Sequence, residues 1–140
     1  MITTNVDISL QLRREGVRPS VTRVAVVKYL MEHHNHPTVD ELYAHLVEQY
    51  PGLSRTTVYN TVHTLVDSRV LTTIEGSPEG MRVDLACNPH AHFVCDVCGA
   101  VADIAMELPE PPDQLSVTRT QLVFRGVCCN CKSIDKEKIN

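Results

Sequence analysis

Apolar side chains recur at three- and four-residue intervals through the first half of the chain, which is the pattern of amphipathic helices. The pattern predicts a first helix over about Val6–Glu15 that stops at Gly16, a common residue just past a helix end. A second helix is predicted to begin near Ser20 and is closed off by Pro37. Its apolar face consists of Val24, Val27 and Met31.

A third helix is indicated by Thr38 followed three residues later by Glu41, the sequence of a capping box. Its apolar positions follow at intervals of four: Leu42, Leu46 and Tyr50. Pro51-Gly52 then turns the chain.

The next segment, Ser54–Ser68, fits either a strand or a helix. Its β-branched residues favour a strand and are individually poor helix formers: Thr56, Thr57, Val58, Thr61, Val62, Thr64 and Val66. The segment is nevertheless long for a strand, Ser54 is a good N-cap, and one face is apolar. That face consists of Val58, Val62, Leu65 and Val66. We therefore predict a helix.

The opposite face of this helix carries hydrogen-bonding groups and a planar ring. It presents Arg55, Thr56, Tyr59, Asn60 and His63. Such a face could contact base edges in the major groove of DNA. The alternative is an amphipathic helix whose polar face is only exposed to solvent, which the pattern supports equally.

Two short strands are predicted after this helix, over Leu71–Ile74 and Met81–Leu85, joined by the turn-forming residues Glu75–Gly80. A small helical bundle followed by a hairpin describes a winged helix, in which the third and fourth helices form a helix-turn-helix. Beyond the hairpin the chain is strand-like and rich in Cys, His and Pro. We predict an α+β protein with an N-terminal winged helix-turn-helix domain at residues 1–85 and a second, smaller domain at 86–140.

Composition limits what such a chain does. Its 140 residues form one compact domain or two small ones. A net charge of -4 argues against a protein that binds nucleic acid with its whole surface, so a DNA contact has to be local. No stretch approaches the roughly 20 apolar residues of a membrane span, and the N-terminus does not resemble a signal peptide. We expect a cytoplasmic protein without a membrane partner.

Six cysteines in a cytoplasmic protein indicate metal binding rather than disulfides. Four of them form two Cys-x-x-Cys pairs: Cys95 with Cys98, and Cys128 with Cys131. Two such pairs at the ends of neighbouring strands would bind one tetrahedral Zn2+, which has no open position for water and is therefore structural. The alternative is a reduced dithiol pair or a redox switch. Cys87 and Cys129 fall outside the pattern.

A second candidate site consists of histidine and aspartate. His90 and His92 are two residues apart, so both imidazoles point to the same side of a strand. Carboxylates are available at Asp84, at the end of the hairpin, and at Asp103, on a predicted strand. His36 lies between the second and third helices, although spacing alone does not single it out from its neighbouring histidines. Such ligands suit iron, manganese or zinc, and the alternative is a pair of surface histidines.

Taken together, these features resemble the ferric-uptake-regulator family of bacterial metal-dependent repressors over about Leu10–Lys132. The resemblance is carried by Gly16–Pro19 with Thr22-Arg23, His36–Tyr43, Ser54–Tyr59, His90–Gly99 and Gly126–Cys131. It implies a winged-helix DNA-binding domain, a small α/β dimerisation domain with a four-cysteine zinc site, and a regulatory metal between them. It also implies a homodimer that binds a palindromic double-stranded DNA operator and is not an enzyme.

The peroxide-sensing branch of this family binds Fe2+ or Mn2+ through three His and two Asp. The chain matches those positions one for one: His36, Asp84, His90, His92 and Asp103. The iron-sensing branch usually has Glu where Asp103 stands, and it commonly has a further His where this chain has Thr120. The resemblance therefore favours a peroxide sensor in which iron-catalysed oxidation of His36 or His90 releases the metal. The alternative is an iron- or other metal-responsive uptake regulator of the same family.

Candidate DNA contacts lie on the predicted recognition helix and near the N-terminus. They are Arg18, Arg23, Arg55, Thr56, Thr57, Tyr59 and Asn60. We expect Arg55 and Tyr59 to contact bases, and Arg18, Arg23 and Thr57 to contact phosphates.

Two further features qualify this picture. The segment Glu107–Ser116 contains three prolines and is poorly suited to forming the family's dimerisation helix. A zinc hydrolase that uses His90 and His92 is disfavoured because the chain lacks a general base such as an HExxH motif supplies.

Overall fold

The structure, a computed structural model, describes residues 4–75, 80–86 and 90–132. The chain divides into two compact units. The first runs to Glu75 and takes in Met81–Cys87, and the second covers the chain from Asn88 onward together with Gly76–Gly80. Within the described ranges, every helix is too short or too polar to cross a lipid bilayer.

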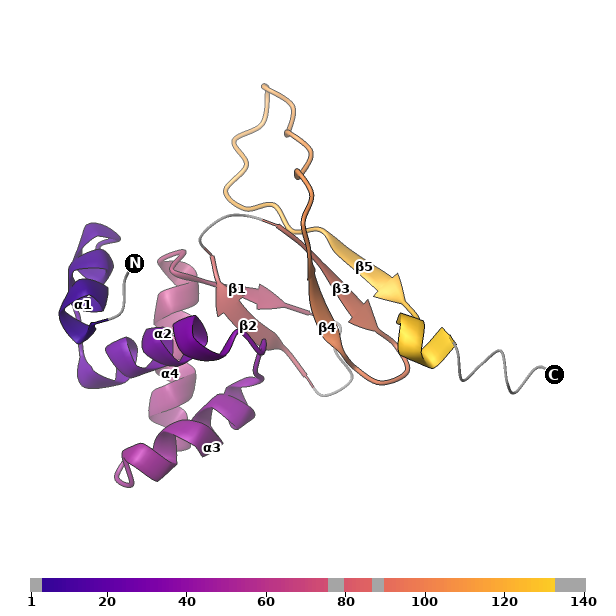
Figure 1. The fold of residues 1–140 in the computed structure, drawn as a ribbon. Coiled ribbons are helices and arrows are strands. Elements are labelled where there is room, and N and C mark those ends of the chain that lie inside the picture. Colours follow the sequence, from indigo (N-terminus) through magenta and orange to yellow (C-terminus); the bar gives the residue numbers. More distant parts are fainter. Residues whose placement is uncertain (1–3, 76–79, 87–89, 133–140) are drawn as a thin grey trace. The chain divides into compact units, whose positions relative to one another are not determined.

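Four helices make up most of the first unit (Figure 1). They are α1 (Asn5–Arg14), α2 (Val21–His33), α3 (Val39–Gln49) and α4 (Arg55–Asp67). Each begins at a Ser or Thr whose hydroxyl accepts a hydrogen bond from a backbone N–H three residues on, so local capping sets these boundaries. The predicted capping box of Thr38 and Glu41 is present, and Gly16 follows α1 with a φ of +77°.

The ambiguous segment Ser54–Ser68 is helical, as predicted. Ser54 caps α4 by accepting from the Thr57 N–H at 3.1 Å. Three residues of the apolar stripe are buried, Val58 and Leu65 fully, and Val66 is half-buried against the core. Burial of this stripe outweighs the weak intrinsic helix preference of the β-branched residues.

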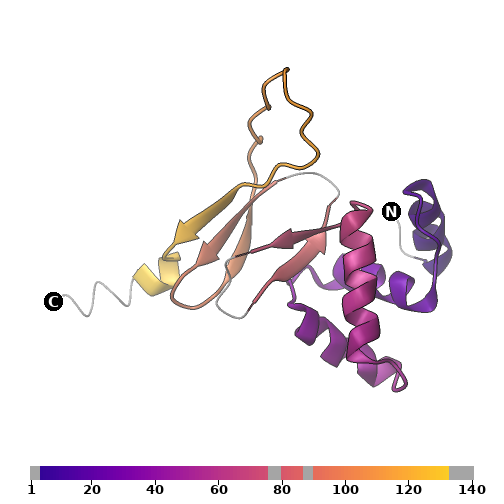
Figure 2. The same ribbon diagram turned by 180° about the vertical axis from the view of Figure 1, so that it is seen from behind.

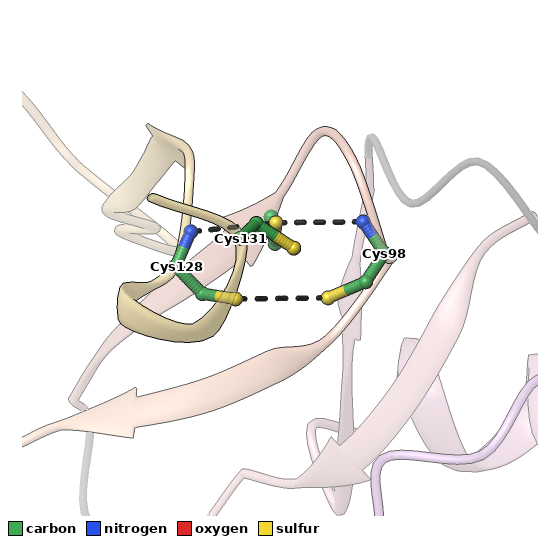
Figure 3. Close-up of side chains that lie close together, drawn as sticks. Cys98, Cys128 and Cys131 are labelled. Carbon is green, nitrogen blue, oxygen red and sulfur yellow. Dashed lines mark hydrogen bonds between the residues drawn. The ribbon is translucent and has the colours of Figure 1, made fainter. Parts of the chain in front are cut away.

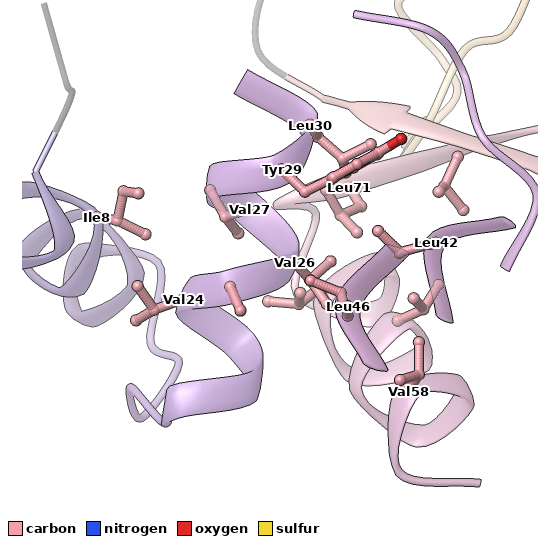
Figure 4. Packing of buried hydrophobic residues seen from close by; sticks show 14 of the residues in the cluster. Ile8, Val24, Val26, Val27, Tyr29, Leu30, Leu42, Leu46, Val58 and Leu71 are labelled. Carbon is pink, nitrogen blue, oxygen red and sulfur yellow. The ribbon is translucent and has the colours of Figure 1, made fainter. Parts of the chain in front are cut away.

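The core of the first unit forms where the helices meet (Figure 4). Its fully buried side chains come from all four helices and include Ile8, Val26, Leu42 and Val58. The helix α2 contacts each of the other three helices, so it is the centre of the bundle.

A two-stranded hairpin follows α4 (Figures 1 and 2). The strands β1 (Leu71–Ile74) and β2 (Arg82–Leu85) pair antiparallel. The second strand begins one residue later than predicted, and residues 76–79 of the connecting turn lie outside the described residues. The other edge of β2 pairs with the segment between α2 and α3, because the Val83 N–H donates to the Pro37 carbonyl at 2.9 Å. This pairing attaches the wing to the helices.

The second unit contains a three-stranded sheet in the order β4-β3-β5. Its strands are β3 (Ala91–Cys95), β4 (Val101–Ile104) and β5 (Val123–Gly126). The central strand β3 is antiparallel to β4 and parallel to β5. Residues 105–122 provide the long connection that a parallel pair needs, and they form neither helix nor strand. The prediction that Glu107–Ser116 is not a helix is therefore confirmed.

Candidate metal centres

The four cysteines of the Cys-x-x-Cys pairs converge in the second unit. Cys95 ends β3 and Cys128 follows the end of β5, and these two strands are parallel neighbours. The Asp96 N–H donates to the Gly126 carbonyl at 2.7 Å, which holds the two turns together. The four sulfur atoms lie within 4.8 Å of one another. The predicted placement at the ends of adjacent strands is confirmed.

The spacing of the sulfurs fits a tetrahedral ion. The Sγ atoms of Cys98 and Cys128 are 3.8 Å apart (Figure 3). Four thiolates about 2.3 Å from a tetrahedral Zn2+ would themselves be separated by about 3.8 Å. This cluster can therefore hold one zinc ion with every coordination position filled by protein.

The backbone prepares one of these sulfurs to carry negative charge. The Cys95 Sγ accepts hydrogen bonds from the N–H groups of Cys98 at 3.5 Å, Cys128 at 3.4 Å and Val97 at 3.4 Å. These donors lower the pKa of Cys95 to about 6. In contrast, hydrogen bonding to the Cys128 thiol together with burial raises the pKa of Cys131 to about 12. Without metal, the cluster thus stabilises a thiolate at Cys95 most strongly.

An ion pair that the sequence analysis did not identify supports the first cysteine turn. The Arg125 guanidinium on β5 donates to the Asp96 carboxylate at 2.6 and 3.1 Å. Both residues border the cluster, so the pair ties the turn to the neighbouring strand. Of the two remaining cysteines, Cys129 is exposed and Cys87 lies outside the described residues.

The second unit also brings two histidines onto one carboxylate. His92 on β3 lies directly opposite Asp103 on β4 in the antiparallel register. The Asp103 Oδ1 is 3.0 Å from the His90 Nε2 and 3.3 Å from the His92 Nε2. The two imidazole rings have their centroids 4.5 Å apart. The structure thus brings His90 and His92, expected to point the same way, together with Asp103.

The first unit contains a similar pair. The His36 Nε2 lies 3.4 Å from an Asp84 carboxylate oxygen. His36 has a φ of +47°, an unusual conformation for a residue with a side chain. Arg82 holds it there because its guanidinium donates to the His36 carbonyl at 2.9 Å. Arg82 was not among the residues predicted from the sequence, although it lies two residues before Asp84 and therefore on the same face of β2.

The structure distinguishes His36 from its neighbour His33. The His33 ring stacks on Tyr29, with centroids 4.2 Å apart, and its Nδ1 lies 3.0 Å from the Tyr29 carbonyl. Each unit thus offers imidazole nitrogen beside carboxylate oxygen, a ligand set that suits iron, manganese or zinc.

The predicted DNA-contact residues on α4 all face solvent. They are Arg55, Thr56, Thr57, Tyr59 and Asn60. Arg18 is also exposed. Arg23 is half-buried, and its guanidinium donates to the Arg18 carbonyl at 2.7 Å, so it also stabilises the loop before α2.

Comparisons with known proteins agree with this architecture. The sequence model described as the ferric uptake regulator family matches residues 14–123. The chain is 31% identical over 128 residues to the peroxide-responsive repressor PerR of Staphylococcus epidermidis, covering 86% of this chain and 85% of that protein.

Two solved structures have a similar fold. The Helicobacter pylori ferric uptake regulator Fur has a TM-score of 0.71 at 20% identity, with 94% of this chain and 95% of that chain covered. PerR from Streptococcus pyogenes has a TM-score of 0.52 at 25% identity, with 91% and 92% covered. The extent of the family match shows that the chain belongs to the ferric uptake regulator family of metal-responsive transcriptional regulators.

Proposed function

We propose that the chain is a homodimeric, metal-dependent, DNA-binding repressor that senses hydrogen peroxide through iron-catalysed oxidation of a ligand histidine. In this proposal residues 1–85 form the DNA-binding domain. Residues 86–140 form the dimerisation domain, which Zn2+ stabilises through four thiolates: Cys95, Cys98, Cys128 and Cys131. The protein acts in the cytoplasm.

The observation that carries the proposal is that each unit contains its own histidine–aspartate group. His36 lies 3.4 Å from Asp84 in the first unit, and two histidines lie within 3.3 Å of Asp103 in the second. The proposed regulatory Fe2+ or Mn2+ takes its ligands from both groups: His36, Asp84, His90, His92 and Asp103. Ligands from both units would fix the angle between them, so metal affinity and operator affinity are linked reciprocally.

Two features favour the peroxide-sensing branch. Asp103 stands where the iron-sensing branch usually has Glu, and Thr120 stands where that branch commonly has a further His. A relative that is 31% identical over most of the chain is named a peroxide-responsive repressor.

Sensing depends on the ligand rings themselves. Fe2+, when bound, would supply the one-electron chemistry that cleaves the O–O bond of hydrogen peroxide beside the imidazoles, with the imidazole ring as the net source of the two electrons. The ring of His36 or His90 then takes up one oxygen atom of the peroxide, and the other oxygen leaves as water. The oxidised ring no longer ligates as before. The two units lose their fixed angle, and the repressor releases DNA.

DNA recognition would use the exposed face of α4. Two such helices in a homodimer, about one helical turn of DNA apart or a multiple of that, would recognise a palindromic operator. In this proposal Arg55 and Tyr59 contact bases, with Thr56 and Asn60 beside them. Phosphate contacts come from Arg18, Arg23 and Thr57.

The test is anaerobic DNA binding followed by intact-mass analysis. A duplex is first selected from a random library with the zinc-loaded, Mn2+-loaded protein. We expect Fe2+ and Mn2+ to support binding and a chelator to abolish it. A peroxide pulse should release only the iron-loaded protein, with a gain of one oxygen on a peptide that contains His36 or His90.

An exposed histidine outside the proposed metal site provides the control. The His45→Gln variant, altered at an exposed histidine of α3, should respond to peroxide as wild type does. Metal-dependent binding without oxygen gain would favour the alternative, a metal-responsive uptake regulator. Binding that is equal in chelator and in metal would contradict the proposal.

A further inference from the structure

Two exposed side chains of α4 are both held by one carboxylate of α3. The Asp40 Oδ1 lies 3.4 Å from the Arg55 Nη1, and it accepts a hydrogen bond from the Tyr59 hydroxyl at 3.4 Å. The Arg55 guanidinium also lies over the Tyr43 ring, 5.3 Å from its centroid. Arg55 is therefore held by two residues of α3, one through charge and one through an aromatic face.

The spacing along both helices explains this arrangement. Asp40 and Tyr43 are three residues apart on α3, and Arg55 and Tyr59 are four residues apart on α4, so each pair shares one face of its helix. Because α3 and α4 pack against each other, the two faces meet at their margins. The contact is built into the helix-turn-helix itself.

The Asp40–Arg55 pair contributes little to the stability of the fold. The Arg55 and Asp40 side chains are 62% and 59% exposed. Water screens an ion pair of this kind, and such pairs add little to the free energy of folding. The contact instead restricts the rotamers of two long side chains that would otherwise sample many positions.

A held guanidinium retains the groups that recognise a base. Arginine has five N–H donors, and the contact of Arg55 with Asp40 is made through Nη1. The remaining donors can still form a bidentate contact with the O6 and N7 of guanine. The Asp40 carboxylate also repels phosphates, which weakens binding wherever Arg55 finds no matching base.

We propose that Asp40 is a positioning residue that determines DNA specificity, because it orients Arg55 and Tyr59 for base contact and lowers affinity for unmatched DNA. The inference rests on the proposed function, in which Arg55 and Tyr59 contact bases. It adds a role for α3, which recognises no base itself in this scheme.

The experiment compares Asp40→Asn with Glu48→Gln, which removes the same charge from an exposed position at the far end of α3. Dissociation constants are measured by fluorescence anisotropy on the full-length, metal-loaded protein. The two probes are the duplex selected by wild type from a random library and a scrambled duplex of equal composition. Measurements at several salt concentrations separate phosphate contacts from base contacts.

We expect Asp40→Asn to bind the scrambled duplex about two- to fivefold more tightly, because one repulsive charge is removed. The ratio of selected to scrambled affinity should fall about tenfold, within the discrimination that one bidentate base contact provides. Asp40→Glu should restore part of the ratio, and Glu48→Gln should leave it unchanged. In an Arg55→Ala background, Asp40→Asn should change the ratio far less, as coupling through Arg55 requires.

Three outcomes would contradict the proposed role of Asp40. If Asp40→Asn leaves the ratio unchanged, or weakens both duplexes equally at an unaltered melting temperature, the inference is wrong. An equal effect of Asp40→Asn with and without Arg55 would also overturn it. If wild type binds its selected duplex equally well in chelator, the proposed metal dependence of DNA binding is wrong. The role of Asp40 is still tested in that case, because the affinities of the Asp40 variants for both duplexes can still be compared. Absence of any duplex binding by wild type would overturn both.

Discussion

Arg82 connects the stability of the first unit to the geometry of His36, a proposed ligand of the regulatory metal, and Arg82→Met tests this connection. Arg82 is only 8% exposed. Its guanidinium donates to the His36 carbonyl at 2.9 Å and lies 3.4 Å from the Glu41 carboxylate. Methionine keeps much of the buried aliphatic volume but provides no donor, so the substitution removes these contacts without opening a large cavity.

The size of the effect follows from the two contacts. A buried hydrogen bond from a charged donor contributes about 1.5–3 kcal/mol. The pair with Glu41, whose side chain is 52% exposed, adds at most about 1 kcal/mol. We expect Arg82→Met to lower the unfolding free energy of the first unit by about 1.5–4 kcal/mol. His36 also loses the anchor of its carbonyl, so Mn2+ affinity should fall about 10- to 100-fold, as when other outer-shell partners are removed.

The assay combines urea unfolding followed by far-UV circular dichroism with calorimetric titration of Mn2+ into zinc-loaded protein. The control is Arg14→Met, because Arg14 is an exposed arginine in the last turn of α1. Its unfolding free energy should change by less than about 0.5 kcal/mol. A stability loss at wild-type Mn2+ affinity would refute the link between Arg82 and the ligand. Wild-type stability would refute the proposed contribution of the two contacts.

Three further predictions concern the second unit. The pKa of Cys95 is lowered to about 6 from 9.0, so its thiolate stabilises the zinc-free fold increasingly as pH rises from about 6 to 9. The free energy of unfolding of the zinc-free protein, measured with denaturant, should therefore be higher at pH 8 than at pH 6. Zinc binding should therefore release more protons at pH 5.5 than at pH 7.5, which calorimetry in buffers of different ionisation enthalpy measures, and an equal release would contradict the assignment. Chelation of zinc should lower the denaturant concentration at which the β3–β5 sheet unfolds, measured by circular dichroism, while the unfolding of the helices of the first unit changes little. Asp103→Asn should weaken Mn2+ binding with little effect on zinc content measured by mass spectrometry, and a parallel loss of zinc would indicate a structural role instead.

Local signals predicted the helices well. Ser54 marks the start of α4 because a single hydroxyl satisfies a nearby N–H, and this can be recognised without knowing the rest of the fold. The Cys-x-x-Cys pairs are equally local, so the four cysteines that cluster in the structure could be picked out by their spacing alone.

Contacts between residues far apart in the sequence could not be predicted from the sequence alone. The register that places Asp103 opposite His92 depends on strand pairing, for which single residues carry no signal. The contacts of Arg82 with His36 and of Asp40 with Arg55 join residues that lie far apart in sequence. An arginine or aspartate at such a position looks like ordinary surface charge until the partner is known.

The strand β3 connects the cysteine cluster to the histidines of the second unit. Cys95 ends this strand and His92 lies three residues earlier, about 10 Å along an extended chain. The cysteine cluster joins the ends of β3 and β5, and the pairing of β3 with β4 places Asp103 beside His90 and His92. In the proposed function, zinc in the cysteine cluster therefore does more than stabilise the unit, because the cluster joins the end of the strand that carries His92 to the neighbouring strand β5.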